Sequence, residues 1–551
     1  MIRISLILIV VHTCCFSTFA TDYHVGPSEA YTNIGDIRWD TLKAGDRVFI
    51  HWRSTPYKEK WVINLQGTAD NRIEIIGISG PQGQKPLIDG ADAVTVPNVN
   101  FWNESRGVIK IGGSNTPADD LPAYITINNL EIRSGHPAYQ FTNDNGQPET
   151  YANNAAAIYV EKAAHLIIRN CTLHDCGNGI FIGAFNGQTE NILIEHNYIH
   201  GNGIVSSALE HNTYTEAKDI TYQYNHFGPL RAGADGNNLK DRSAGLTVRY
   251  NWIESGNRQL DLVDSGSSVL INDPRYRTTH AYGNILIEPD GAGNSQIVHY
   301  GGDSGTTANF RKGTFYFFNN TIVSSRNGNT TLMRLSTNDE TAEAFNNIIF
   351  NTAAGGNMAM ISGTGVFNMS HNWIKTDWQI CHCTPTGSLN DLGGNMTGTD
   401  PGFTNLNTQD FTLKSIAAVI NQGDTLPAAM LPDHGVNREY RKHIFYQSRH
   451  DDTQMDMGAF EFGSSMSNCT SITDFVGGIW SNGDPSVSTL AFIEDLYDTS
   501  TMGSFTTCSC TVTKVGSLTV MNGDSVTVEE VMQADGPLEV QSGGVLSVQN
   551  Q

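Results

Sequence analysis

Asn251-Trp-Ile253, near the middle of the chain, is one copy of a pattern in which a large apolar residue follows two positions after an Asn. The other copies are Asn197-Tyr-Ile199, Asn225-His-Phe227, Asn284-Ile-Leu286, Asn320-Thr-Ile322, Asn347-Ile-Ile349 and Asn372-Trp-Ile374, preceded in the same register by Cys171-Thr-Leu173. Counted from Cys171, successive copies begin 26, 28, 26, 33, 36, 27 and 25 residues apart. This spacing predicts the coils of a solenoid, two of which carry insertions.

Short alternating strands fill each repeat, for example residues 246–250 (Leu-Thr-Val-Arg-Tyr), and Gly and Asn separate them. One coil cannot bury its own apolar face, so we expect coils stacked about 4.8 Å apart with inward Ile, Leu and Val in continuous ladders. Each repeated Asn is expected to adopt a left-handed conformation at a bend and to bond the equivalent Asn in the next coils. The sequence therefore predicts an all-β parallel β-helix with these Asn residues as scaffold.

The composition limits the partners of the chain. It has 551 residues, with Lys+Arg 33 against Asp+Glu 56 and a net charge of -23. Such an acidic chain lacks the clustered cations that bind nucleic acid, and an acidic polysaccharide would need a local basic patch to bind. After the first twenty residues no apolar run of about 18 residues could span a bilayer, so we expect no membrane partner. We also expect a monomer.

Residues 1–20 have the pattern of a secretory signal peptide, with Arg3 ahead of an apolar stretch and small Thr18 and Ala20 near its end. We therefore expect a secreted protein, extracellular, periplasmic or at the cell surface. Seven cysteines follow this segment, and one or two disulfides could form outside the cytoplasm. Zinc binding at Cys381-His382-Cys383 or Cys508-Ser509-Cys510 is the alternative, although neither pair has a second ligand pair at zinc spacing.

The two ends of the predicted stack resemble known coils. Residues 22–25 and 42–50 resemble the opening coil of secreted β-helix polysaccharide lyases, with their "L-x-A-G-D-x-V" turn. Asp400-Pro-Gly-Phe403, Asp410-Phe-Thr-Leu413 and Met457-Gly-Ala-Phe-Glu461 resemble the closing coil of the same pectate-lyase-like superfamily. This resemblance implies a right-handed parallel β-helix over residues 21–463 as the catalytic domain.

A second domain is predicted from residue 464 to residue 551. A polar linker at residues 464–467 precedes alternating runs at residues 516–520, 524–528 and 536–540. These runs resemble the β-rich modules near the C-termini of secreted Bacteroidota proteins, and their repeated "G-x-L-x-V" suggests a second, smaller β-roll. Attachment or secretion is the expected use, with a stabilising cap as the alternative.

Two cations are predicted to share one exposed face of the solenoid. With Leu239 facing the core, alternation turns Lys240 outward, and Arg242 joins it if the strand stays extended. Tyr214 lies eleven residues before Asn225, as Lys240 lies eleven before Asn251, so Tyr214 should stack beside Lys240, with His211 nearby. We expect these four residues to be catalytic. An exposed Lys or Arg on a solenoid can also be a solvated charge or the partner of a stacked Asp.

The following coils supply further candidates. Inward Leu260 and Leu262 would present Asp261 outward, and His299, Tyr300 and Asp303 lie in a later coil. We expect substrate contacts from Arg258, His299, Tyr300 and Asn238. The scattered acidic residues Asp261, Asp264, Glu254 and Asp303 are candidates for a calcium site, without a loop of fixed spacing.

The coil that carries Lys240 resembles the catalytic region of the chondroitinase B and alginate lyase family, where "E-I-I-x-x-K-S" precedes an "N-x-F" bend. Lys240 falls on that family's base, while its "R-H-G" is absent and Asn257-Arg258-Gln259 only approximates its Arg. Asp235-Gly236 with Lys240 is also similar to the "D-G-F-x-x-K" of a calcium-using pectate lyase family. The resemblance implies a lyase that cleaves a uronic-acid polysaccharide by β-elimination. A lysine base must be largely neutral, for which Arg242 could supply the nearby cation, whereas Asp261 would oppose it.

Two other classes of function remain open from the sequence. A glycoside hydrolase on the same fold needs paired carboxylates, which Asp261 with Asp264 or Asp303 could provide. A non-catalytic binder or adhesin would use exposed aromatics, for which Trp252, Trp373 and Trp378 are candidates.

Overall fold

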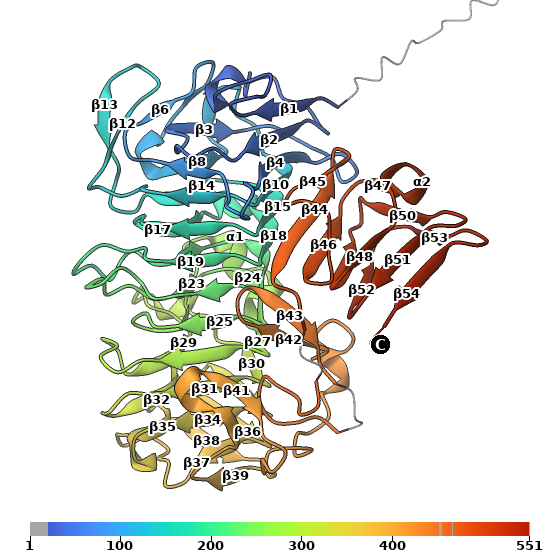
Figure 1. The fold of residues 1–551 in the computed structure, drawn as a ribbon. Helices are drawn as coiled ribbons and strands as arrows, with labels where there is room; N and C mark the ends of the chain where they lie inside the picture. The colour runs from blue at the N-terminus through green and yellow to red at the C-terminus, as the bar shows by residue number, and fades with distance from the viewer. Residues whose placement is uncertain (1–19, 451–453, 465–466, 550–551) are drawn as a thin grey trace, which may run out of the picture.

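The computed structural model describes residues 20–450, 454–464 and 467–549. Residues 1–19 of the predicted signal peptide, and residues 465–466 of the predicted linker, lie outside the described residues. The chain is nearly all β, and its coils stack along one axis from the N-terminal end (Figure 1). A smaller β-rich module, formed by the last part of the chain, lies beside the stack (Figure 1).

Three long parallel sheets make the stack, and each complete coil contributes one strand to each sheet. Sheet 1 contains, in spatial order, β1 (Asp22–Val25), β2 (Arg47–His51), β4 (Ile73–Ile78), β10 (Ala123–Asn128), β15 (Ala164–Arg169), β18 (Glu190–Glu195), β21 (Lys218–Gln223), β24 (Ala244–Arg249), β27 (Thr278–Tyr282), β30 (Thr314–Phe318), β33 (Thr341–Phe345), β36 (Val366–Ser370) and β38 (Ser388–Asp391). Sheet 2 contains β39 (Met396–Gly398), β37 (Trp373–Lys375), β34 (Ile348–Asn351), β31 (Thr321–Ser324), β28 (Ile285–Glu288), β25 (Trp252–Glu254), β22 (His226–Phe227), β19 (Tyr198–His200), β16 (Thr172–His174), β11 (Glu131–Arg133) and β5 (Leu87–Asp89). Sheet 3 contains β13 (Pro148–Thr150), β12 (Gln140–Thr142), β6 (Ala93–Thr95), β3 (Glu59–Ile63), β8 (Gly107–Ile111), β14 (Ala156–Val160), β17 (Asn178–Ile182), β20 (Thr213–Thr215), β23 (Leu239–Asp241), β26 (Leu260–Leu262), β29 (Gln296–Tyr300), β32 (Thr330–Leu335) and β35 (Met358–Ile361).

Short elements complete the stack and its surface. Three separate two-stranded antiparallel sheets are β7 (Asn100–Phe101) with β9 (Ser114–Thr116), β40 (Phe403–Asn405) with β41 (Asp410–Leu413), and β42 (Arg438–Arg441) with β43 (Phe445–Ser448). At the edge of sheet 3, β12 and β13 are also antiparallel. The α-helices are α1 (Ser268–Ile271) and α2 (Thr499–Met502). The 3₁₀ turns are η1 (Ile34–Asp36), η2 (Glu104–Arg106), η3 (Phe185–Gly187), η4 (Pro274–Arg277), η5 (Thr307–Asn309), η6 (Gly355–Asn357), η7 (Leu406–Thr408) and η8 (Ala428–Met430). No helix of the described residues is long and apolar enough to cross a membrane.

The repeated Asn residues form the ladder that the spacing predicts. Each amide Nδ2 donates to the Oδ1 of the Asn one coil further on, from Asn197 to Asn372 and then to Asn395, over 2.9 to 3.1 Å. The expected left-handed conformation, however, belongs to the preceding residue, for example Tyr224 (φ 57) and Tyr250 (φ 54). The prediction was wrong by one position, because the residue before the Asn turns the chain and leaves the Asn side chain pointing inward.

The core is the apolar interior of the stack. Alternation within β24 buries Leu246 and Val248, while Thr247 between them stays partly exposed. Equivalent residues stack from coil to coil, as Ile220 pairs with Leu246. Each coil therefore depends on its neighbours for burial, as expected of a solenoid.

The stack of coils ends at β38 and β39, earlier than the predicted closing coil. Residues 403–450 and 454–460 return along the outer face of sheet 2, where Phe403, Phe411 and Tyr440 pack on Trp252 and Trp373. The closing-coil prediction was wrong here because β40 and β41 form an antiparallel hairpin outside the stack. The outer face of sheet 2 is therefore covered by protein from β25 to β37.

The C-terminal module is a second, smaller set of parallel sheets. Its sheets contain β45 (Ile479–Trp480), β44 (Ser471–Val476), β46 (Thr489–Ile493), β49 (Ser509–Val512) and β52 (Met532–Ala534); β47 (Leu496–Asp498), β50 (Ser517–Val520) and β53 (Leu538–Val540); and β48 (Phe505–Thr507), β51 (Ser525–Val528) and β54 (Val545–Val548). A disulfide joins Cys469 to Cys508, and a second one, at the end of the β-helix, joins Cys381 to Cys383. Four of the cysteines considered for zinc or disulfides are thus paired with each other.

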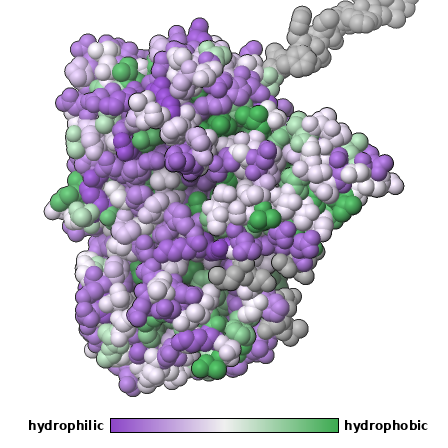
Figure 2. All heavy atoms as spheres, viewed as in Figure 1, coloured by the Kyte–Doolittle hydropathy of each residue, from purple (hydrophilic) through white to green (hydrophobic). Residues whose placement is uncertain are grey.

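Buried ion pairs hold the module against sheet 1. Arg169, at the end of β15, donates from Nε to Glu195 Oε1 (2.6 Å) and from Nη1 to Glu494, and Asp474 Oδ1 lies 3.7 Å from Nη1. Arg47 Nη1 bonds Asp495 Oδ2 at 2.6 Å. The visible face of the whole molecule is mostly hydrophilic with small hydrophobic patches (Figure 2). Since the module covers part of sheet 1, and residues 403–450 and 454–460 cover sheet 2 from β25 to β37, we turn to the side chains on sheet 3.

Candidate functional site

One row of outward side chains crosses consecutive strands of sheet 3. Because inward residues alternate with outward ones, the strand register places them side by side. We name as the outer row the residues Phe181, Tyr214, Lys240, Asp261, His299 and Arg334, from β17, β20, β23, β26, β29 and β32. The pairing of Tyr214 with Lys240, and the outward direction of Asp261, are as the repeat spacing predicted.

Lys240 and Arg242 both bind the carboxylate of Asp303. Lys240 Nζ lies 2.5 Å from Asp303 Oδ2, and Arg242 Nη2 lies 2.8 Å from Asp303 Oδ1. Arg242 Nε also donates to Tyr214 Oη at 2.9 Å. Asp303 comes from the loop after β29 and its side chain is about one-third exposed, with a relative exposure of 33%. The three predicted residues Tyr214, Lys240 and Arg242 therefore do converge, on a carboxylate from another coil.

These contacts contradict the prediction that Lys240 acts as a neutral base. Burial by itself disfavours the ammonium ion, but the charges of Asp261 and Asp303 outweigh burial and raise the pKa of Lys240. Lys240 Nζ bonds Asp261 Oδ2 at 2.7 Å as well as Asp303. Lys240 is consequently a charged group that binds carboxylates. The expected lowering of the Lys240 pKa by Arg242 is therefore wrong, because the charges of the two carboxylates raise this pKa.

His211 lies beside Tyr214, with 5.5 Å between the ring centroids. Its Nδ1 accepts a hydrogen bond from the backbone N–H of Asn237 (2.9 Å), which places the ring proton on Nε2. Burial, aided by the charge of Lys240, lowers the pKa of His211 to about 3. His211 is therefore a neutral hydrogen-bond donor and not a proton acceptor.

A second set of contacts joins Asp261, His299 and Ser336. His299 Nδ1 lies 2.8 Å from Asp261 Oδ1, and His299 Nε2 lies 2.8 Å from Ser336 Oγ. Burial favours a protonated carboxyl at Asp261, but the hydrogen bond from His299 and the charge of Lys240 hold its pKa well below the usual range. Burial also lowers the pKa of His299, against the attraction of Asp261. The imidazole is thus neutral, with its proton on Nδ1.

Ser336 and Arg334 were missed by sequence reasoning. Arg334 is in register with His299, is partly exposed, and makes no side-chain hydrogen bond or ion pair with any residue that the structure describes. Ser336 follows two positions later on the same face. Alternation from Leu335 would have turned both outward, but the insertions of the two longest repeats hid which earlier residues they face.

Two predicted substrate contacts are scaffold instead. Tyr300 is fully buried beside Phe315 in the core, because it follows the outward His299 by one position and so points inward. Asn238 is also fully buried, and its Nδ2 bonds the carbonyl of Glu254 at 2.7 Å while its Oδ1 accepts from Asn212. Arg258 lies at the edge of the outer row, 2.8 Å from Gln296 Oε1 through Nη2.

Three of the predicted calcium ligands lie together but are bonded to protein groups, and Glu254 lies apart from them. Asp261 and Asp303 are occupied by Lys240, and Asp264 accepts the backbone N–H of Asp303 at 2.8 Å. Glu254 lies on sheet 2, where its Oε2 accepts from Trp252 Nε1 at 3.1 Å. The residues present do not fit a calcium site, since cations and backbone N–H groups fill the positions that an ion would take.

A different group of side chains could hold a metal ion near the N-terminal end of the stack. His24 Nδ1 lies 3.0 Å from His51 Nε2, and His51 Nδ1 lies 3.5 Å from Glu29 Oε1. These residues belong to the first coil and the turn that follows β1, far along the chain from the outer row. They take no part in the site described here.

The outer row begins with aromatic rings. Phe181 and Tyr214 lie 5.3 Å apart, Tyr159 of β14 lies 5.4 Å from Phe181, and the Arg106 guanidinium lies 4.6 Å from the Phe181 centroid. These rings present apolar faces beside charged groups. The aromatics proposed for a binder are placed differently: Trp252 and Trp373 are buried under residues 403–460, which overturns their assignment as exposed.

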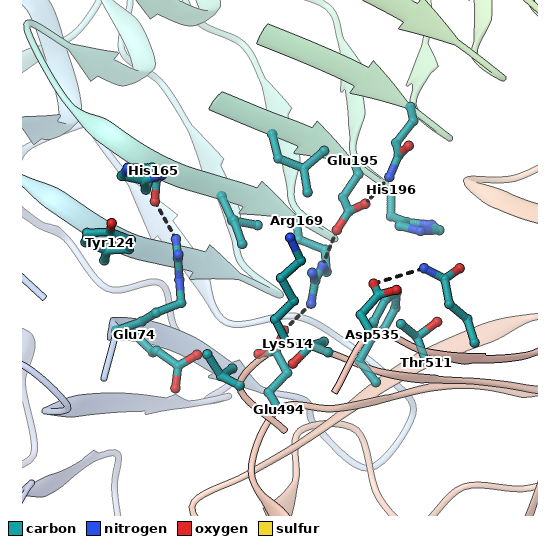
Figure 3. Close-up of a pocket in the computed structure, with 18 of the residues that line it drawn as sticks. Glu74, Tyr124, His165, Arg169, Glu195, His196, Glu494, Thr511, Lys514 and Asp535 are labelled. Carbon is teal, nitrogen blue, oxygen red and sulfur yellow. Dashed lines mark hydrogen bonds and ion pairs between the residues drawn. The ribbon is translucent and has the colours of Figure 1, made fainter. Parts of the chain in front are cut away.

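A large hollow lies elsewhere, between sheet 1 and the C-terminal module. This cavity of about 660 Å³ has Tyr124, His165 and Glu74 on one side and Lys514 and Asp535 on the other (Figure 3). Its central charges are paired, as the dashed contacts of Arg169 with Glu195 and Glu494 show (Figure 3). We place the candidate site on the outer row because the partly exposed Asp303 carboxylate is held there by two cations, and Arg334 is unpaired among the described residues.

Two of the carboxylates considered for glycoside hydrolysis, Asp261 and Asp303, lack the raised pKa of a proton donor. That reaction needs a protonated carboxyl group to donate to the leaving oxygen. The charge of Lys240 overcomes the effect of burial and keeps the pKa of Asp303 below its usual value, as it does for Asp261. Both groups are ionised near neutral pH.

Comparison with known proteins agrees with the fold. The family model described as "Right handed beta helix region" matches residues 87–274 and 147–309. The chain is a right-handed parallel β-helix protein, which confirms the prediction from the Asn repeat. No curated protein matches the sequence.

Several solved structures are similar to this chain at low identity. An alginate lyase from Paenibacillus sp. str. FPU-7 is 13% identical, with a TM-score of 0.37 over 61% of this chain and 94% of that one. The pectate lyase Pel9A is 12% identical, with a TM-score of 0.44 over 80% and 97%. The surface protein and adhesin PfbA of Streptococcus pneumoniae is 12% identical, with a TM-score of 0.40 over 64% and 89%.

Proposed function

We propose that this protein is a secreted polysaccharide lyase that cleaves a uronic-acid polymer by β-elimination on the outer row. The observation that carries the proposal is that Lys240 and Arg242 both bind the Asp303 carboxylate, beside the Tyr214 hydroxyl. Two cations that hold one carboxylate in this way form a site for the carboxylate of a uronic acid. Asp303, on a partly exposed loop, occupies that place until a substrate carboxylate displaces it.

The reaction requires removal of the proton next to the sugar carboxylate, and cations that stabilise the resulting enolate-like anion. Lys240 and Arg242 supply that positive charge. Tyr214 Oη is the proton acceptor in this scheme, since Arg242 Nε donates to it at 2.9 Å and stabilises negative charge on the oxygen. The C4–O bond then breaks, the proton passes from Tyr214 to the leaving oxygen, and a C4–C5 double bond remains.

His211 and the aromatic rings position the sugar in this scheme. The His211 ring, with its proton on Nε2, is a donor beside Tyr214. Phe181 and Tyr159 extend the surface away from the cations, so that a neighbouring sugar can lie on apolar faces. The overall negative charge of -23 makes this local patch necessary for an acidic polymer.

The test is product chemistry on a panel of alginate, polygalacturonate and chondroitin. We expect a wild-type product that absorbs at about 235 nm, from the new double bond next to the carboxylate. Tyr214→Phe should remove this activity, and Lys240→Ala should also remove it through loss of carboxylate binding. Tyr316→Phe is the matched control, because Tyr316 lies on sheet 1 and stacks on His280.

Thermal unfolding shows whether each variant is folded. New reducing ends without this absorbance would indicate a hydrolase, and no chain shortening on any polymer of the panel would indicate a binder. Either result, or full activity in folded Tyr214→Phe, overturns the proposal.

A further inference from the structure

The contacts at the end of the outer row have the geometry of an activated nucleophile. A nucleophilic hydroxyl needs a base within hydrogen-bond reach, and the base needs a third group that fixes its tautomer. Ser336 Oγ, His299 Nε2 and Nδ1, and Asp261 Oδ1 supply this series, at 2.8 Å for each contact. The three residues come from β26, β29 and the end of β32, so the fold assembles them from three coils.

The direction of each proton follows from the charges. Asp261 is ionised and can only accept, so His299 carries its proton on Nδ1. Burial keeps the imidazole neutral, which leaves a lone pair on Nε2 that can accept from Ser336 Oγ at 2.8 Å. This is the protonation state in which a histidine can take the serine proton. The carbonyl oxygen of Gly302, 3.0 Å from Ser336 Oγ, is the competing acceptor for the same proton.

Asp261 is itself held firmly. Its Oδ2 accepts from Lys240 Nζ at 2.7 Å and from Asn237 Nδ2 at 2.8 Å, while Oδ1 faces His299. Only 1% of the residue is exposed. A buried carboxylate fixed in this manner keeps the imidazole in one orientation and stabilises it when it becomes charged.

The surroundings of Ser336 leave its hydroxyl close to a glycine loop. Gly301 has φ +135, and a Cβ at this position would lie 2.5 Å from Ser336 Oγ, so a larger residue is excluded. The backbone N–H of Gly302 donates to Ser336 Oγ at 2.9 Å. Ser336 is half-buried, whereas His299 behind it is buried, so the hydroxyl is the member of the series that a ligand can reach.

An unpaired cation stands beside the hydroxyl. Arg334 lies on β32 in register with His299, and Ser336, which directly follows β32, contacts His299, so both side chains are on the same face of sheet 3. Among the described residues Arg334 has neither a hydrogen-bond nor an ion-pair partner for its side chain. A guanidinium group at this position can stabilise the negative oxygen that forms when a carbonyl is attacked.

We propose that Ser336, His299 and Asp261 form the catalytic triad of an ester hydrolase that removes short acyl groups from sugar hydroxyls. Ser336 Oγ attacks the acyl carbonyl carbon while its proton moves to His299 Nε2. The bond between that carbon and the sugar oxygen breaks, and the same proton passes to the departing oxygen. Water then repeats the sequence on the acyl-enzyme, which releases the carboxylic acid and restores Ser336.

The identity of the acylated polymer rests on the proposed lyase function, since both sites lie on one row and share Asp261. The esterase chemistry is tested without it. The first probe is p-nitrophenyl acetate with the full-length mature protein, and the second is diisopropyl fluorophosphate, which labels an activated serine. Uronate cleavage is followed separately by its unsaturated product, so either activity can fail alone.

We expect release of p-nitrophenol by the wild type and a single phosphoryl label on Ser336, located by peptide mass. Ser336→Ala should lose the label and reduce hydrolysis by about 10³-fold or more, and His299→Gln by a similar factor. Ser370→Ala is the matched control, because Ser370 lies at the end of β36 in sheet 1. The wild-type rate should rise with pH as the His299 imidazolium ion becomes the neutral imidazole. It should stay constant above neutrality, because the pKa of His299 is below its ordinary value.

A serine that only completes the hydrogen bonding of His299 gives a different result. The folded wild type would then neither hydrolyse the acetate ester nor take up the label, and the proposal would be overturned. Labelling or hydrolysis that persists in Ser336→Ala would overturn it equally. Melting temperatures of the variants distinguish loss of the fold from loss of chemistry, and His299→Gln provides a second variant if Ser336→Ala does not fold.

Discussion

The cluster around Arg169 and the outer row around Lys240 both contain cations that contact carboxylates, but the two regions differ in burial and in role. At Arg169 the C-terminal module closes over sheet 1, and each guanidinium contact goes to a carboxylate of the protein. At Lys240 the partner Asp303 is partly exposed, and Arg334 further along the row is unpaired in the described structure. The buried ion pairs of Arg169 join the C-terminal module to sheet 1. On the outer row, the incomplete pairing of charges leaves charged groups that a ligand can bind.

The largest effect is expected from removing the cation of the covered cluster. Arg169→Ala leaves Glu195, Glu494 and Asp474 buried without their shared partner, which should cost about 3–5 kcal/mol of unfolding free energy. Urea unfolding measures it. Arg38→Ala is the matched control, since Arg38 pairs with Asp40 on the surface and should change stability little. Equal stability of the two variants would contradict the assigned role of the cluster.

A smaller effect, a gain in substrate affinity, is expected when a carboxylate is removed from the outer row. Asp303→Ala removes the carboxylate that competes with substrate for Lys240 and Arg242, so KM for the uronate polymer should fall by up to about tenfold, or ~1.4 kcal/mol. Asp290→Ala serves as the control, because Asp290 is an exposed loop carboxylate that bonds Asn327. An unchanged or higher KM in Asp303→Ala would mean that Asp303 supports the site and does not compete with substrate.

The smallest expected effect is a pH dependence of the stability that Asp474, in the cluster around Arg169, contributes. Burial, together with the charge of Glu494, raises the pKa of Asp474 to about 6 against the pull of Arg169. A raised carboxyl pKa means that the folded state holds this proton more tightly than the unfolded state. Its contribution to stability is therefore complete at low pH and is lost as pH rises from the ordinary aspartate value through about 6.

Thermal unfolding between pH 5 and pH 7 tests this dependence. The melting temperature of the wild type should decrease more steeply with rising pH than that of Asp474→Asn, which cannot titrate at this position. Parallel curves for the two proteins would show that Asp474 does not titrate in this range.

Much of the fold was predictable because the repeat is a local signal with a regular period. The equal offsets from Asn225 and Asn251 placed Tyr214 beside Lys240, and the structure has that pairing. Strict alternation from His299 would also have placed Tyr300 in the core, so that error was avoidable. Asn238 was harder to place, since its burial results from a second set of Asn contacts at a bend outside the strands.

The amino-acid order determined the coils, their register near the middle of the stack and the outward direction of Lys240, because coil length and alternation are properties of neighbouring residues along the chain. Only the tertiary structure decided which carboxylates meet Lys240, which side chain faces His299, and where residues 403–460 and the C-terminal module pack. Those contacts join residues separated by insertions of unequal length, and charge pairing and burial act through space, so chain spacing carries no record of them.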